Sequence, residues 1–129
     1  MIRRISSVIA LTLLGSAAAC SASPIATDTV PRSVETARQL ARTVASNGGC
    51  GGFEDYNFNR SADTWVFTCQ TPGASFEIVA YGSQSARSEG LKTLDNSGNT
   101  YIARNFYAVA VVGSYGNSSA DSALAPFSK

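Results

Sequence analysis

The first clear pattern of apolar and polar positions is typical of an amphipathic helix. Pro31 suits a first helical turn, because a missing N–H needs no partner there. The run Asn47-Gly48-Gly49 offers the left-handed conformation that commonly ends a helix. Apolar residues between these signals have the three-and-four spacing of one helix face: Val34, Ala37, Leu40, Ala41 and Val44. A helix is therefore predicted to begin at Pro31, with Arg38 and Arg42 on its solvated surface.

Beyond Gly49 the pattern changes to the period of two that strands show. In the run TWVFTCQT, Trp65, Phe67 and Cys69 alternate with polar or smaller residues, and the residue types favour a strand. A preceding strand is expected over residues 50–56, with polar residues 57–63 between the two strands. The prediction is an antiparallel hairpin that turns near Asn59 and Arg60.

The rest of the chain predicts one more strand, a helix and a final strand. Phe76, Ile78 and Ala80 alternate with Glu77, Val79 and Tyr81 after the turn signal TPGAS. Ser83 or Ser85 can then cap a helix that runs to about Leu94 and leans on the sheet. Residues 101–112 are expected to form a core strand or a bent pair, and residues 113–129 a flexible tail. The predicted fold is α+β: a small antiparallel sheet with the helices on one face.

Two cysteines are placed to staple the predicted hairpin. Cys50 and Cys69 lie symmetrically about Asn59-Arg60, so they fall opposite each other at a separation that fits a disulfide. Closing a loop of about twenty residues contributes on the order of 3 kcal/mol. A metal or redox pair is disfavoured, because the spacing is not C-x-x-C and the chain has no His.

The N-terminal segment is typical of an exported protein. Arg3 and Arg4 precede an apolar run that is too short to span a bilayer, which needs about 20 apolar residues. Small residues at Ala17 and Ala19 satisfy an ordinary cleavage site. The small residues directly before Cys20 also resemble a bacterial lipobox, although a usual lipobox has Leu where Ala17 stands. Residues 1–19 are predicted to be a signal peptide and residues 20–30 a lipidated N-terminus and tether.

Cysteine parity supports lipid attachment at Cys20. The chain has three cysteines, and an odd count in an exported protein leaves one unpaired. If Cys20 carries fatty acyl chains such as palmitate, the folded domain keeps an even pair. The protein would then be held on the outer face of the cell membrane. Two alternatives stay open: a secreted protein cleaved at or after this site, and an uncleaved anchor.

Composition limits the possible partners. Without residues 1–19, eight Lys and Arg stand against nine Asp and Glu, so the mature net charge is about −1. This charge offers no basic field for nucleic acid and no polybasic patch for anionic lipid. The expected domain, residues 31–112, is a single small unit.

The runs GGCGGF, WVFTC, SFEIVAYGSQSAR and YIARNFYAVAVV cover most of residues 34–112. In this order they resemble a loose class of small actinobacterial exported proteins and lipoproteins. In that class a two-cysteine hairpin precedes an F-x-I-type strand, a short helix and a final aromatic-rich strand. The resemblance implies an exported single domain and no particular activity.

Candidate catalytic groups are few. Without His, Ser-His-Asp and Cys-His systems are impossible, and no cofactor or metal site is predicted. Glu54 and Asp55 are adjacent and would point to opposite faces of a strand, which is poor geometry for a pair. Asp63, Arg87 and Arg104 complete the set that a carboxylate enzyme could use: Asp63 as an acid lying across the hairpin, Arg87 and Arg104 as its arginines.

These observations favour binding over catalysis. The expected function is an exported, lipid-anchored envelope domain that binds an envelope protein or a glycan, with a prophage-type surface exclusion lipoprotein as one variant. Tyr56, Phe58 and Arg60 form a possible contact patch at the hairpin end, where aromatic and Arg side chains could anchor a partner. The other interpretation, which the pattern favours, is that Tyr56 and Phe58 cover the disulfide and the edge of the sheet. The alternative is a small carboxylate-dependent secreted hydrolase or lyase.

Overall fold

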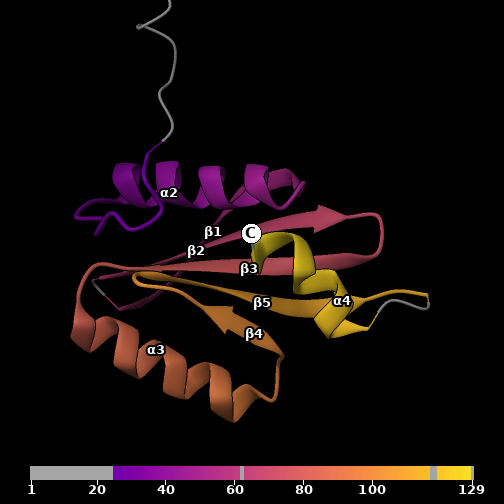
Figure 1. Cartoon of the computed structure of the whole chain (residues 1–129). Coiled ribbons are helices and arrows are strands. Elements are labelled where there is room, and N and C mark those ends of the chain that lie inside the picture. The colour runs from indigo at the N-terminus through magenta and orange to yellow at the C-terminus, as the bar shows by residue number, and fades with distance from the viewer. Residues whose placement is uncertain (1–24, 62, 117–118, 129) are drawn as a thin grey trace, which may run out of the picture.

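The computed structural model describes residues 25–61, 63–116 and 119–128 (Figure 1). Helices and strands follow one another in an order close to the predicted one. They are α2 (Val34–Asn47), β1 (Gly51–Ser61), β2 (Thr64–Thr71), β3 (Ala74–Tyr81), α3 (Gln84–Ser97), β4 (Tyr101–Ala103), β5 (Tyr107–Ser114), α4 (Ala120–Leu124) and the 3-10 helix η1 (Ala125–Ser128). In this part of the chain no helix is both long and apolar enough to cross a membrane.

The five strands form one antiparallel sheet with the order β1-β2-β3-β5-β4. The predicted bent pair over residues 101–112 is present as β4 and β5. Because β5 pairs with β3, the short strand β4 becomes one edge of the sheet and the long strand β1 the other. The α+β class and the antiparallel sheet are therefore confirmed.

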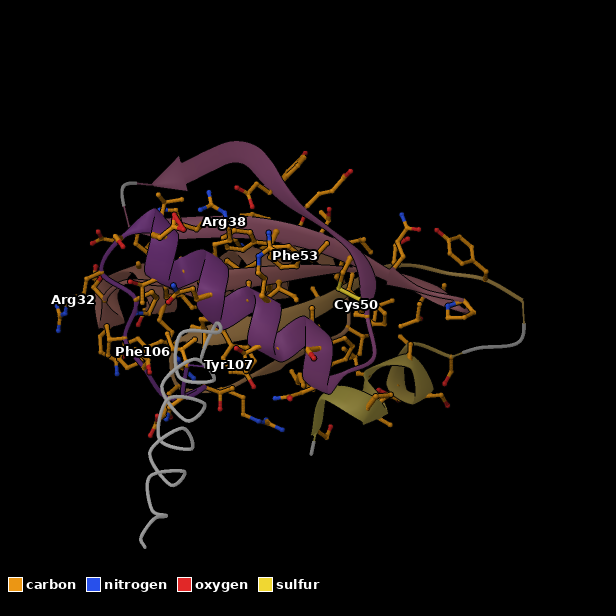
Figure 2. The ribbon with its side chains drawn as sticks, turned by 90° about the horizontal axis from the view of Figure 1, so that it is seen from above. Arg32, Arg38, Cys50, Phe53, Phe106 and Tyr107 are labelled. Atoms are coloured by element: carbon orange, nitrogen blue, oxygen red, sulfur yellow. A yellow bond between two sulfur atoms is a disulfide. The ribbon has the colours of Figure 1, made fainter. Side chains whose placement is uncertain are left out.

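Helices cover both faces of this sheet. Phe76, Ile78 and Ala80 of β3 belong to the apolar cluster that holds α2 and α4, whereas Val79 and Tyr81 belong to the cluster that holds α3. Figure 1 shows α2 and α3 on opposite sides of the sheet, and Figure 2 shows α2 lying across the strands. The prediction placed the helices on one face. Their actual placement follows from β3, which is apolar on both faces, so each face needs a cover.

Helix α2 begins later than predicted, at Val34. The side chain of Ser33 caps it by accepting a hydrogen bond from the backbone N–H of Thr36 at 3.2 Å, and its extended backbone (φ −152°) marks it as the N-cap. Pro31, the predicted start, is instead buried in the segment before the helix. The buried face of α2 consists of Ala37, Leu40, Ala41, Val44 and Ala45.

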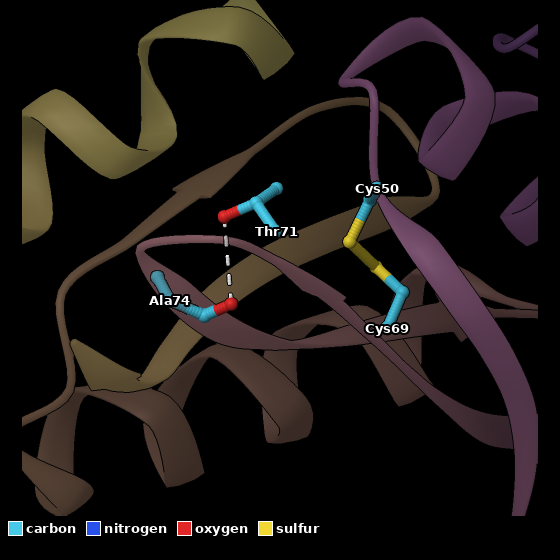
Figure 3. Close-up of a disulfide and its surroundings, with 4 residues drawn as sticks. All are labelled: Cys50, Cys69, Thr71 and Ala74. Atoms are coloured by element: carbon cyan, nitrogen blue, oxygen red, sulfur yellow. Dashed lines mark hydrogen bonds between the residues drawn. A yellow bond between two sulfur atoms is a disulfide. The ribbon is translucent and has the colours of Figure 1, made fainter. Parts of the chain in front are cut away.

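The hairpin is stapled by the predicted disulfide. Cys50 and Cys69 form an S–S bond with their Cα atoms 5.6 Å apart (Figure 3). The predicted turn at Asn59 and Arg60 is wrong, because β1 continues to Ser61. The 11 residues of β1 face the eight of β2. Two irregularities in the pairing of β1 with β2 accommodate the extra residues of β1, and Cys50 still lies beside Cys69.

Helix α3 has the predicted cap and a longer span than predicted. Ser83 accepts a hydrogen bond from the N–H of Ala86 at 3.1 Å, and Gly98 ends the helix in the left-handed region (φ 78°). Gly90 lies against the ring of Tyr81, where an added Cβ would be 2.8 Å from Cζ. A glycine inside this helix is therefore required by close packing.

The C-terminal segment is folded, contrary to the predicted flexible tail. Ser119 caps α4 by accepting a hydrogen bond from the N–H of Ser122. Leu124 and Phe127 are buried in the same cluster as α2. The ring of Phe127 packs on that of Phe76 with centroids 4.9 Å apart. Two apolar side chains three residues apart gain enough by this burial to order a segment that is otherwise rich in Ser, Gly and Ala.

The predicted tether, residues 20–30, is wrong in its second half. Ile25 packs against the larger cluster, and the N–H of Thr29 donates to the carbonyl of Ala26 at 3.1 Å. Residues 25–30 are therefore part of the folded domain. The predicted signal peptide and the predicted lipidation site, Cys20, lie outside the described residues.

Candidate functional site

A hollow of about 250 Å³ opens between the first half of α2 and the β1–β2 pair. Its lining residues are Val34, Arg38, Asp55, Tyr56, Trp65, Val66 and Phe67. Asp55 pairs with Phe67 and Tyr56 with Val66, so these pairs point to opposite faces of the sheet. Asp55 and Phe67 therefore line the hollow from the α2 face of the sheet, and Tyr56 and Val66 also belong to its lining.

A bidentate ion pair lies in the wall of the hollow. Nε of Arg38 donates to Oδ2 and Oδ1 of Asp55 at 2.9 and 3.1 Å, and Nη2 donates to Oδ2 at 2.7 Å. Nη1 of Arg38 also donates to Oε1 of Glu35, one helical turn earlier, at 2.7 Å. Figure 2 shows Arg38 between α2 and β1. The guanidinium is thus fixed by two carboxylates from two elements.

The pair is charged at neutral pH. Hydrogen bonds from Arg38 hold the pKa of Asp55 below its usual value, against a smaller opposing effect of desolvation, and the charges of Arg38 and Arg42 add to this lowering. The hydrogen bond with Asp55 likewise raises the pKa of Arg38. Asp55 is therefore a poor proton donor, and its carboxylate is already engaged as an acceptor.

Arg42 covers the same strand one helical turn further along α2. Its guanidinium carbon lies 4.8 Å from the ring centroid of Phe53, and Phe53 stacks on Phe67 with centroids 5.4 Å apart. The predicted solvated surface holds for Arg42, which is exposed, whereas Arg38 is half-buried. The prediction missed that both arginines contact side chains of β1. The missed signal is that Asp55 shares its face with Phe53. A carboxylate on the core-facing side of a strand needs a cationic partner.

The predicted contact patch falls partly within the described structure. Tyr56 is exposed to 48 % and is one of the residues that line the hollow. The side chains of Phe58 and Arg60 lie outside the described part of the chain. Val34, exposed to 47 %, adds an apolar side chain to the rim of the hollow.

The groups expected for a carboxylate enzyme do not converge. Glu54 pairs with Thr68 and Asp55 with Phe67, so the two carboxylates point to opposite faces, as predicted. Arg87 donates from Nε and Nη2 to the carbonyl of Arg104 at 3.1 and 3.0 Å, at the end of the sheet that carries β4. That edge is the one opposite β1. Among the described residues, no three His, Cys, Asp or Glu side chains gather as metal ligands would.

No family model, no curated protein and no solved structure matches this chain. The class of protein is therefore defined by its own fold: a small α+β domain with a five-stranded antiparallel sheet and one disulfide-stapled hairpin. The resemblance to small actinobacterial exported proteins stays a prediction. The hollow beside β1 is the candidate functional site.

Proposed function

We propose that the protein is an exported cell-envelope domain, anchored by a lipid on Cys20 to the outer face of the cell membrane, which acts by binding. Its partner would be an envelope protein or a glycan. The site of binding would be the hollow between α2 and β1.

The observation that carries the anchoring proposal is the use of the cysteines. Cys50 and Cys69 are joined to each other, so both cysteines of the folded domain are used. Cys20 is the third cysteine of the chain and directly follows the apolar run and Ala17–Ala19. A disulfide in a small domain is typical of proteins outside the reducing cytosol. Lipidation would give the remaining thiol a chemical role.

Binding is favoured over catalysis by the state of the charged groups. Asp55 is held ionised by Arg38, and Glu54 points to the opposite face. A glycosidase-type mechanism needs two carboxylates flanking one bond, one of them protonated. The alternative of a small carboxylate-dependent secreted hydrolase or lyase would require turnover that is lost when Glu54 or Asp55 is replaced.

The experiment is the intact mass of the protein recovered from its native cells, before and after reduction, with Cys20→Ala alongside. We expect a chain that begins at Cys20 and carries a diacylglycerol mass, which the variant lacks. Reduction should add the mass of two hydrogens, one for each sulfur of the disulfide.

Two other masses would contradict the anchoring proposal. An unmodified chain that begins after Ala19 or later would make the protein a secreted one. A chain that retains residues 1–19 would indicate an uncleaved anchor.

A further inference from the structure

We infer that the hollow between α2 and β1 binds a neutral, hydroxyl-rich ring, a sugar residue of a glycan, with Arg38 and Asp55 as its hydrogen-bonding groups and Trp65 beside it. The inference deepens the proposed function and rests on it, because a domain on the outer face of a membrane meets glycans. It names the class of ligand and the residues that would recognise it.

The first argument is the hydrogen-bonding capacity that the ion pair leaves for a ligand. A guanidinium has five N–H donors, and three of those of Arg38 are used by Asp55 and Glu35 among the described residues. Oδ2 of Asp55 accepts two hydrogen bonds, whereas Oδ1 accepts one, from Nε. Two N–H donors of Arg38 and one acceptor position on Oδ1 of Asp55 therefore remain among the described residues. A sugar hydroxyl needs this combination, because it both donates and accepts.

The second argument is charge. The hollow is lined by one cation and one anion, Arg38 and Asp55, which are joined to each other. A charged ligand of either sign would be attracted to one of these two side chains and repelled by the other, which lies only a few ångströms away. At this distance the repulsion offsets much of the attraction. A neutral polar ligand gains the hydrogen bonds without that repulsion.

The third argument is the shape and rigidity of the hollow. Trp65, Phe67 and Val34 give it apolar walls, against which the C–H face of a pyranose can pack. Arg38 is held at both ends of its guanidinium, by Asp55 and by Glu35, so little side-chain freedom is lost on binding. The side chains stand on a helix and two paired strands, elements that hold them in place.

Trp65 provides a direct test, because it is the single tryptophan of the chain and lines the hollow. The mature protein, with its disulfide intact, is titrated with chitotetraose, cellotetraose and mannotetraose while tryptophan emission is recorded. We expect a saturable change with at least one of them. Its affinity should stay constant between about 0.05 and about 0.5 M salt, because no net charge is neutralised.

Variants then place the binding at the hollow. Asp55→Asn removes the charge that orients Arg38, and should weaken binding by about tenfold or more. Arg38→Lys keeps the charge but loses the planar fork, and should weaken binding similarly. Glu54→Gln is the matched control, because Glu54 is the neighbouring acid and points to the other face; its affinity should equal that of the unchanged protein.

Several results would overturn the inference. One is the absence of any saturable change with the three oligosaccharides. Another is equal affinity in the Asp55→Asn, Arg38→Lys and Glu54→Gln variants, all shown to be folded by their urea midpoints. A third is binding of trilysine or of an extended peptide in place of the sugars, with an affinity that falls with salt. The titration does not depend on the lipid, so its outcome is separate from that of the mass measurement on Cys20.

Discussion

The two faces of the sheet are built very differently. On the α2 face, 17 buried residues form one cluster, which includes the disulfide and the residues of α4 and η1. On the α3 face, the buried cluster has six residues, and its helix contributes one of them, Leu94. The α2 face also receives both ends of the described chain, through Ile25 and Phe127.

The two faces therefore differ in what they provide: the α2 face provides most of the buried core, and the α3 face leaves more polar surface exposed. The large cluster fixes α2 against β1 and so holds Arg38 and Asp55 in place at its margin. The smaller cluster leaves part of its own face polar, with Glu54 and Gln70 exposed on β1 and β2. The candidate site therefore lies beside the more extensively packed half of the molecule, where a binding geometry can be kept rigid.

The largest expected effect comes from removing the aromatic ring that closes the large cluster. Phe127→Ala should lower the free energy of unfolding by about 3–5 kcal/mol, because the ring is buried against Phe76 and beside Gly48. Urea denaturation measures this change. Tyr115→Ala, an exposed aromatic in the same part of the chain, is the control and should cost less than about 1 kcal/mol. If Phe127→Ala lowered the free energy of unfolding equally little, the sequence-based prediction of a flexible tail would be supported.

An intermediate effect on the free energy of unfolding is expected on the α3 face, which has the smaller cluster. Gly90→Ala should destabilise the fold by about 1–2 kcal/mol, because the added Cβ would lie 2.8 Å from Cζ and 2.9 Å from the hydroxyl oxygen of Tyr81. In an open helix the same change would stabilise by up to about 1 kcal/mol. Ser88→Ala, an exposed position of α3, tests that ordinary behaviour. A stabilising Gly90→Ala would mean that α3 is not tightly seated on the sheet.

The smallest expected effect is the pH dependence of the ion pair at the margin of the large cluster. The folded pKa of Asp55 is lowered, so its contribution to stability is present above the ordinary pKa of about 4 and is lost as the pH falls through the folded value. The unchanged protein should therefore exceed Asp55→Asn in urea midpoint at neutral pH, with a difference that narrows below about pH 4. Glu54→Gln serves as the control for removing an acid from the same strand. If the difference in urea midpoint between the unchanged protein and Asp55→Asn persisted at low pH, the ion pair between Arg38 and Asp55 would not be its cause.

Local signals predicted much of the fold correctly. The alternation of Phe76, Ile78 and Ala80 with Val79 and Tyr81 assigned the two sides of β3, and Ser83 was one of two predicted caps of α3. These features depend on residues that are close in sequence, so their pattern can be read without knowing the packing. The hairpin turn was misplaced for the opposite reason: the position of a turn depends on irregularities in the ladder, which leave little trace in β1 beyond its glycines.

The candidate site was only partly foreseeable. Tyr56 was predicted as a contact residue, whereas Arg38 and Asp55, 17 residues apart, were assigned no contact with each other. Arg38 is a cation on a helix, and Asp55 is a carboxylate on the core-facing side of a strand, so each suits an ion pair. Their meeting depends on the side of α2 that turns toward β1, which the helix pattern alone does not specify.

The sequence by itself determined the α+β class, the alternation of the strands and the Cys50–Cys69 disulfide, and it limited the cap of α3 to Ser83 or Ser85. Periodicity, capping and cysteine parity act over short stretches or by simple counting. The tertiary structure alone decided that α3 lies on the face opposite α2, that Phe127 returns to the core, and that Arg38 binds Asp55. Which surface an apolar or charged face meets is set by the burial of all elements together, and that is a property of the assembled fold.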